Sequence, residues 1–293
     1  MSTAVATKQK NLLLSFSKLL AMLCVSPYFL GLSAAHSVTT QNTKILNTKI
    51  KPAESNFTGS INVARVGSLV DNQDGTKTDT IDSTASLSYL FAEKYKLNSI
   101  FYYNQNLNTQ KGDWDDLDLS LVKKPAPLFS RLLFAPGILG VIPMAKSSYI
   151  RKEYQGGIGG VAKFSFEPRT FVGGLDFKFS LSLIKNAFKY ETTLDGKPNS
   201  EYSSVQKFVA SHAYKKLTTS LIFLHLNTLS FQNEIRESFI HFEEIGYDFN
   251  SRFSVAVGHA NTGSALKPNG QDSNILLINE NSSVVYASTT VNF

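Results

Sequence analysis

The carboxy-terminal segment from Ser283 to Phe293 alternates strictly between two kinds of residue. Counted from Val285, every second residue is apolar or a threonine, and the residues between them are mostly polar. The two faces of an extended chain would carry Val285, Ala287, Thr289, Val291 and Phe293 on one side and Tyr286, Ser288, Thr290 and Asn292 on the other. A period of two with one apolar face is typical of a β-strand between two unlike media.

The same rhythm runs through the chain from Thr58 onward. Apolar or alternating runs are separated by short segments rich in Gly, Pro, Asn and Asp, which favour turns. Twelve strands are predicted, near residues 58–71, 79–92, 97–108, 115–122, 130–145, 157–167, 172–191, 203–214, 218–231, 237–249, 253–262 and 276–293.

The connectors between these runs fall into two classes. Those after the odd-numbered runs are longer and hold most of the turn glycines, such as Gly75, Gly196 and Gly270. Those after the even-numbered runs are shorter, as at 93–96, 215–218 and 250–252. Because consecutive antiparallel strands place alternate connectors at opposite ends, the pattern predicts one end with short turns and one with long loops.

The sequence ends on a bare aromatic residue, whereas soluble domains usually fray into polar residues at their ends. The final Phe293 and the apolar residues at every second position before it resemble the closing strand of bacterial outer-membrane β-barrels. In that family the barrel-assembly machinery reads this pattern as a signal. The resemblance therefore implies that role for Val285, Ala287, Thr289, Val291 and Phe293, with the machinery and outer-membrane lipid as partners. The alternative is the last strand of a soluble sandwich that ends in Phe.

We therefore predict an all-β fold, a transmembrane antiparallel up-and-down β-barrel of about twelve strands, with ten or fourteen strands as the alternatives. An even number suits a single-chain bacterial barrel whose two ends lie in the periplasm. The resemblance is to the porin-like class of Gram-negative outer-membrane barrels and identifies no subfamily.

Residues 1–35 have the composition of a secretory signal peptide. Lys8, Lys10 and Lys18 accompany an apolar run that is too short for a membrane-spanning helix, and cleavage is predicted after Ala35. Residues 36–57 are polar and are predicted to form a flexible periplasmic leader, and residues 58–293 the barrel. The single cysteine, Cys24, lies in the signal peptide, so the mature chain is predicted to lack thiol and disulfide chemistry.

The balance of charge excludes one class of partner. The formal net charge is +6, and removing the three signal-peptide lysines leaves 6 − 3 = +3. This weak charge argues against nucleic acid as a partner. No later segment has the long apolar run of a membrane helix, so residence in a membrane requires strands. In such strands apolar and polar residues alternate, so the mean hydropathy of the segment stays near neutral.

Charged residues collect on the more polar face of several predicted strands, and this face is predicted to line the barrel lumen. Two parity slips are needed to place them all inside: a β-bulge near Leu183 and Ile184, and a second slip near Glu243 and Glu244. The predicted lumen-lining residues are Asp116, Asp118, Lys163, Asp176, Lys178, Lys185, Lys189, Glu244 and Asp248. Two roles stay open for these charges: they pair across strands to hold the wall, or they contact passing solutes.

The sequence offers little other chemistry. The five histidines lack metal-ligand spacing, and no phosphate-binding loop is present, so no metal and no cofactor are predicted. His259 and Asn261, with Ser254 or Ser264 nearby, invite comparison with an outer-membrane phospholipase, but the closely spaced His and Ser of that enzyme are absent. The first functional hypothesis is a passive channel for small hydrophilic solutes, with a narrow pore unless the leader or a loop plugs it. The alternatives are a non-conducting surface, structural or adhesion barrel and, third, a hydrolase at the rim; solute identity and oligomeric state stay open.

Overall fold

The computed structural model describes residues 56–70, 77–167, 170–171, 174–267, 272–280 and 282–293. The predicted signal peptide, and the predicted leader up to residue 55, lie outside the described residues. Phe57, predicted as the last residue of the leader, begins the first strand. Among the residues that the structure describes, no helix is long and apolar enough to cross a membrane.

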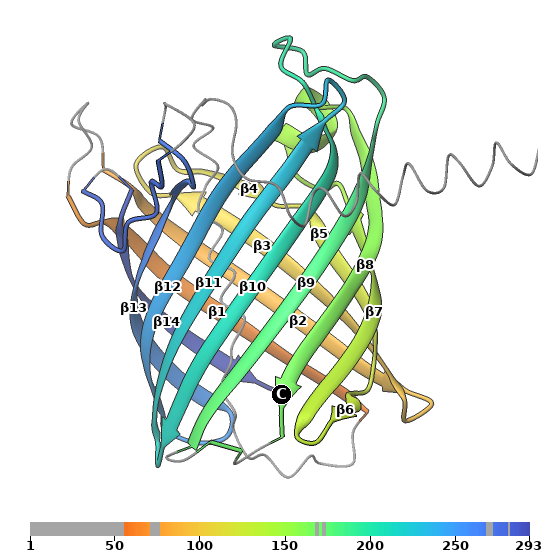
Figure 1. The fold of residues 1–293 in the computed structure, drawn as a ribbon. Coiled ribbons are helices and arrows are strands. Elements are labelled where there is room, and N and C mark those ends of the chain that lie inside the picture. The colour runs from red at the N-terminus through yellow and green to blue at the C-terminus, as the bar shows by residue number, and fades with distance from the viewer. Residues whose placement is uncertain (1–55, 71–76, 168–169, 172–173, 268–271, 281) are drawn as a thin grey trace, which may run out of the picture.

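The described chain is built almost entirely from antiparallel strands (Figure 1). Alternating side chains and frequent turn residues favour this extended structure throughout. The elements are β1 (Phe57–Ser68), β2 (Asp79–Phe91), β3 (Tyr95–Asn106), β4 (Lys111–Trp114), β5 (Leu117–Lys123), β6 (Ala126–Phe129), β7 (Leu132–Ile142), the π-helix η1 (Ser147–Arg151), β8 (Tyr154–Phe166), β9 (Leu175–Phe188), β10 (Ser200–Tyr214), β11 (Leu217–Ser230), β12 (Ile235–Asp248), β13 (Phe253–Ser264) and β14 (Val284–Asn292).

Outside β4 to β6, each strand pairs with its neighbours in sequence, and β1 pairs with β14, so the sheet closes into a barrel. Strands β4 and β5 occupy one position in the wall, because both pair with β3, and β6 is a short addition paired only with β7. The wall therefore has twelve strands, which confirms the predicted fold class. One predicted boundary is wrong: the last strand begins at Val284 instead of residue 276, because residues 275–278 do not pair in the sheet.

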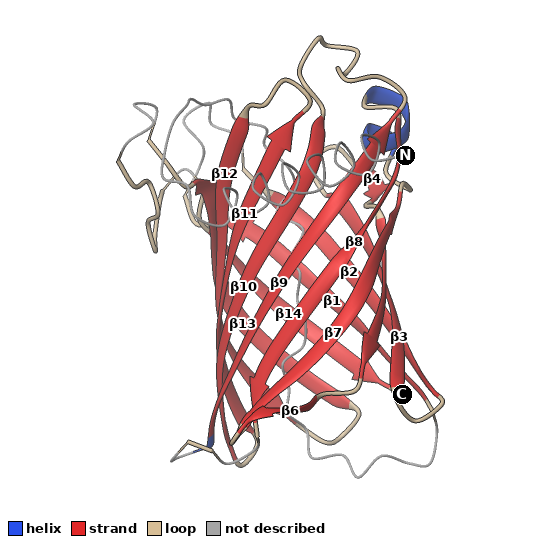
Figure 2. Cartoon of the chain, turned by 45° about the vertical axis from the view of Figure 1, so that its right-hand side comes forward, coloured by secondary structure: helices blue, strands red, loops and turns tan. Residues whose placement is uncertain are grey.

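The connectors confirm the predicted asymmetry between the two ends (Figure 2). At one end, here called the turn end, residues 92–94, 215–216 and 249–252 join adjacent strands. At the other, here called the loop end, the connectors include residues 143–153, which contain η1, and residues 189–199. Long loops at one end and short turns at the other are typical of outer-membrane barrels.

The apolar side chains of β14 point away from the barrel axis. Val285, Val291 and Phe293 are 43%, 46% and 56% exposed, whereas the alternate residues Tyr286, Ser288 and Thr290 are at most 6% exposed. Residues directly opposite each other in an antiparallel pair share one face of the sheet, so the register of each pair extends this assignment around the wall. The apolar residues thus lie outside, as they do in a barrel that spans lipid.

Neither of the two predicted parity slips exists. The pairing of β9 with β8 and β10 is continuous through Leu183 and Ile184, and that of β12 is continuous through Glu243 and Glu244. The register shifts lie elsewhere: at Gln155 in β8, next to Gly156 with its φ of +131°, at Glu201 in β10, and between Pro127 and Phe129 in β6. Unbroken parity places Lys185 and Glu243 on the outward face, with the apolar residues.

The two ends of the barrel wall meet at Phe293. Its backbone N–H donates to the carbonyl oxygen of Gly59 at 3.0 Å, and its carbonyl oxygen accepts from the N–H of Gly59 at 2.9 Å. Its ring lies 6.4 Å from that of Phe57, centroid to centroid. Phe293 thus contributes both backbone pairing and an aromatic contact to the seam between β1 and β14.

Deleting Phe293 is expected to reduce the fraction of heat-modifiable, folded barrel in the outer-membrane fraction, because the seam loses this backbone pair and ring contact. Electrophoretic mobility with and without boiling measures this fraction. Phe129→Ala is the matched control, since Phe129 is an exposed phenylalanine on β6, away from the seam. Equal folded fractions for the deletion and the wild type would contradict the role assigned to Phe293.

Candidate functional site: the barrel lumen

Acidic side chains gather on the inner wall formed by β2 and β5. Asp82 accepts hydrogen bonds from the Thr80 hydroxyl at 3.0 Å and from the side-chain amide of Asn104 on β3. Asp118 of β5 lies opposite Ile100 and Val141 and shares their inward face. Asp82 is 5% exposed, so its charge depends on these polar neighbours for stabilisation.

Lysine side chains gather on the inner wall formed by β8, β9 and β10. Lys163 and Lys207 both lie opposite Ser180 of β9, so their backbones are about 10 Å apart across two strand spacings. Lys178, two residues from Ser180 along β9, has the same facing. Lys96 of β3 is a fourth inward lysine, near the turn end.

One acid and one lysine of these two sets lie across the lumen from each other. The path around the wall from β2 to β10 crosses the same number of strands in either direction. Asp82 of β2 and Lys207 of β10 are therefore on opposite sides of the barrel. A solute passing between them would experience a field directed across the pore, because wall charges act strongly in a confined and partly desolvated space.

Another part of the inner wall is apolar, which the sequence analysis did not predict. A continuous cluster runs from β10 through β14 to β1, and a smaller one on β5, β7 and β8 contains Val122, Ala135 and Val161. Leu224 and Phe242 of the larger cluster are each 1% exposed. The expectation of a charged lumen therefore describes only part of the interior.

Four predicted lumen residues besides Lys163 and Asp118 have inward positions. Asp176 and Lys178 form an ion pair at 2.8 Å, and Glu244 accepts a hydrogen bond from the Tyr286 hydroxyl at 3.2 Å. Asp248 lies opposite Ser254 at the turn end. Pairing within the wall thus accounts for at least part of the inward charge.

Asp116 does not line the middle of the lumen, because its carboxylate binds the connector at the loop end. Its Oδ1 accepts the backbone N–H groups of Met144 and Ala145 at 3.0 and 3.1 Å, and its Oδ2 accepts the Ser148 hydroxyl at 2.7 Å. These bonds hold the start of η1 against the break between β4 and β5. Asp116 therefore fixes the position of the connector that joins β7 to β8.

Lys185 and Lys189 do not line the lumen, and the predicted bulge that would have turned them inward is wrong. Lys185 points outward, 3.8 Å from Glu201 and over the ring of Tyr202. Lys189 lies beyond the end of β9 and pairs with Glu153 at 3.1 Å. The hydrogen bond from Lys189 to Glu153 raises the pKa of the lysine, with a further contribution from Tyr190.

Sequence reasoning missed Lys96, Lys207 and Asp82 as lumen residues. On β10 the inward neighbours of Lys207 are Val205 and Val209, so the polar and apolar faces cannot be told apart by alternation alone. Asp82 lies in a strand with serine or threonine on both faces. The signal that could have found them is the pairing register, which the sequence does not contain.

The residues compared with a phospholipase do not form a catalytic group. His259 faces outward, opposite Glu243 and Val285, whereas Ser254 and Ser264 face inward, opposite Asp248 and Ser238. In the described part of the chain, no group of three or more His, Cys, Asp or Glu side chains is arranged to hold a metal ion.

Comparisons with known proteins identify the class of fold. No protein-family model matches the sequence, and no curated protein is significantly similar to it. Among solved structures, an outer membrane channel from Pseudomonas putida F1 superposes with a TM-score of 0.53 at 9% identity, covering 84% of this chain and 100% of that one. The NanC porin superposes with a TM-score of 0.51 at 12% identity, covering 80% and 98%. The chain therefore has the fold of outer-membrane barrel channels.

Replacing Asp116 by alanine is expected to increase amide hydrogen exchange in residues 144–148, because two backbone N–H groups and one hydroxyl lose their acceptor. Each buried group left unsatisfied costs about 1–3 kcal/mol. Exchange measured by mass spectrometry on the folded barrel tests this. Asp113→Ala is the control, since among the described residues the Asp113 carboxylate accepts only the adjacent N–H of Trp114. Equal exchange in both variants would contradict the anchoring role.

Proposed function

We propose that the protein is a passive outer-membrane channel for small hydrophilic solutes. The observation that carries this proposal is the set of inward charges of both signs, with Lys207 of β10 on the opposite side of the barrel from Asp82 of β2. A barrel of this strand number is too wide for side chains to fill as they fill an eight-stranded barrel, and narrower than the general porins. The fold shared with solved channels and porins supports the same function.

The lysines near the turn end favour contact with solutes over a purely structural role. Lys163 and Lys96 have no ion-pair partner among the residues that the structure describes. A lysine that held the wall together would need such a partner, as Lys178 has in Asp176. An unpaired ammonium group that is retained in a lumen is better explained by contact with water and passing ions or solutes.

The proposed location is the outer membrane of a Gram-negative cell, reached through the predicted signal peptide and the barrel-assembly machinery, with the turn end in the periplasm. Cysteine at Gly196, in a loop-end connector, is expected to react with a membrane-impermeant thiol reagent on whole cells. Cysteine at Ser251, in a turn-end connector, is expected to react only after the outer membrane is opened. The reverse labelling pattern would show that the barrel has the opposite orientation.

Purified folded protein is expected to give discrete conductance steps in planar bilayers. The variant with Lys163→Glu and Lys96→Glu is expected to move the reversal potential in a salt gradient toward cation preference, because two inward cations become anions. Lys185→Glu is the matched control, since Lys185 lies on the outward face of β9. An unchanged reversal potential would remove these lysines from the pore, and folded protein without any conductance would favour the non-conducting barrel.

A further inference from the structure

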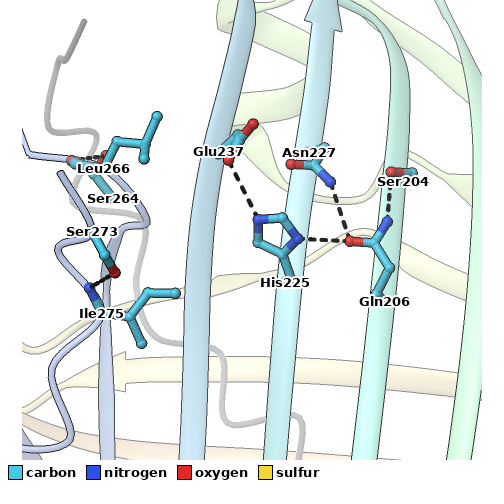
Figure 3. A network of polar contacts seen from close by, with 9 residues as sticks. All are labelled: Ser204, Gln206, His225, Asn227, Glu237, Ser264, Leu266, Ser273 and Ile275. Atoms are coloured by element: carbon cyan, nitrogen blue, oxygen red, sulfur yellow. Dashed lines mark hydrogen bonds and ion pairs between the residues drawn. The ribbon is translucent and has the colours of Figure 1, made fainter. Parts of the chain in front are cut away.

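The outward face of β10 to β12 carries a polar network near the loop end (Figure 3). The Gln206 side-chain oxygen contacts Nδ1 of His225 at 2.9 Å and accepts the Asn227 amide at 3.1 Å. The Gln206 amide donates to the Ser204 hydroxyl at 3.0 Å, and Nε2 of His225 lies 3.6 Å from the Glu237 carboxylate. The pairing register places all of these residues on the outward face. Ser204 and Asn227 are only 7% and 9% exposed, so this network is a largely buried polar cluster on the outer side of the sheet.

Nearer the middle of the same outward face lie His241, which is only 2% exposed, His259 and the exposed Glu243. Glu243 is directly opposite His259, and its side chain is 50% exposed. Its only ion-pair neighbour among the described residues is Nε2 of His241, at 4.0 Å. Neither ring nitrogen of His241, nor Nε2 of His259, has a hydrogen-bond partner in the described part of the chain.

Depth along the strand places Glu243 inside the apolar band. With a rise of about 3.3 Å per residue and a tilt of about 40°, each residue adds about 2.5 Å of height. Glu243 lies four residues above Tyr247, whose ring packs on Phe249 in the turn-end aromatic group. It is therefore about 10 Å above that group, within an apolar band about 25 Å tall. A carboxylate at this depth needs a protein partner, because acyl chains offer neither charge nor hydrogen bonds.

A groove of about 800 Å³ joins this acid to a cation on β1. Glu243 and His259 line one side of the groove and Arg65 the other, with Val285 and Ala287 between them. Arg65 binds Asp79 through Nε and Nη2, each at 3.1 Å, and its side chain is still 71% exposed. From the pairing register, Arg65 and Glu243 lie within about 5 Å of the same depth, on either side of β13 and β14.

We propose that this groove, on the outward face of β11 to β1, is the interface with a second copy of the chain. In two barrels related by a two-fold axis along the membrane normal, the two grooves face each other. The Glu243 edge of one groove then lies opposite the Arg65 edge of the other, at the same depth in the membrane. Glu243 of one copy then faces Arg65 of the other, twice, and Val285 and Ala287 pack at the axis. Acyl chains cannot neutralise the Glu243 carboxylate. The Arg65 guanidinium stays 71% exposed beside its partner Asp79, so it has room for a second carboxylate. A different protein would need the same two charges in the same order, which this groove already supplies.

Disulfide cross-linking tests the interface in intact outer membranes, in a full chain carrying Cys24→Ser. Cysteine at Ala287, near the proposed axis, is expected to form dimers of twice the monomer mass under mild oxidation. Ile158→Cys is the matched control: Ile158 is equally outward, 70% exposed, and on β8, across the barrel from β14. Dimers from Ala287→Cys but not from Ile158→Cys support the proposal. Equal yields at both positions, or no dimer from Ala287→Cys in folded protein, overturn it.

The charges receive a separate test in the same background. Glu243→Gln added to Ala287→Cys is expected to lower the dimer yield several-fold while the heat-modifiable folded fraction is retained. Glu237→Gln is the control, since Glu237 lies in the loop-end network outside the groove. If Ala287→Cys itself does not fold, cysteine at Val257, also in the groove, replaces it.

Two outcomes of this second test count against the interface. A dimer yield that Glu243→Gln leaves unchanged would overturn the charge pairing between the two copies. Cross-links only to a protein of another mass would show that a different partner covers this wall, and would overturn the dimer.

Discussion

The barrel depends on the pairing of every backbone polar group within the sheet, because lipid offers no substitute partner. Closure of β1 on β14 removes the two sheet edges that would otherwise expose unpaired N–H and C=O groups. Once the wall is closed, each side chain has only two directions, into the lumen or out toward the membrane. The direction of each charged side chain on a wall strand follows from that choice, and the pairing register carries it from one strand to the next.

Much of the fold could be predicted from the sequence. The strict alternation in 283–293, the turn residues and the unequal connectors were sufficient for the strand number, the antiparallel order and the two distinct ends. These features are local, and a period of two needs no knowledge of neighbours. The boundary at residue 276 failed because the apolar run at 275–278 looks like a strand but has no pairing partner in the sheet.

The candidate site was harder to predict because facing is transmitted through register. Charged residues were expected to avoid lipid, so bulges were predicted near Leu183 and Glu243 that the structure does not have. Lys207 on β10 was not predicted because apolar residues share its inward face. Alternation identifies the two faces only if outward residues are apolar and lumen residues are polar, and this wall is partly apolar inside and partly polar outside. The cross-strand register, which cannot be read from the sequence, was needed to assign both faces.

The seam between the first and last strands also bears on how the barrel folds. Asn62 of β1 donates to the Thr290 hydroxyl of β14 across 228 residues of sequence. Contacts between such distant segments form late, because closing a long loop costs conformational entropy before the contacts can stabilise the structure. Until the last residues are in place, the edges of β1 and β14 remain free to pair with other chains. The interval between the folding of β1 and the arrival of β14 is therefore the stage at which this protein most needs protection from aggregation.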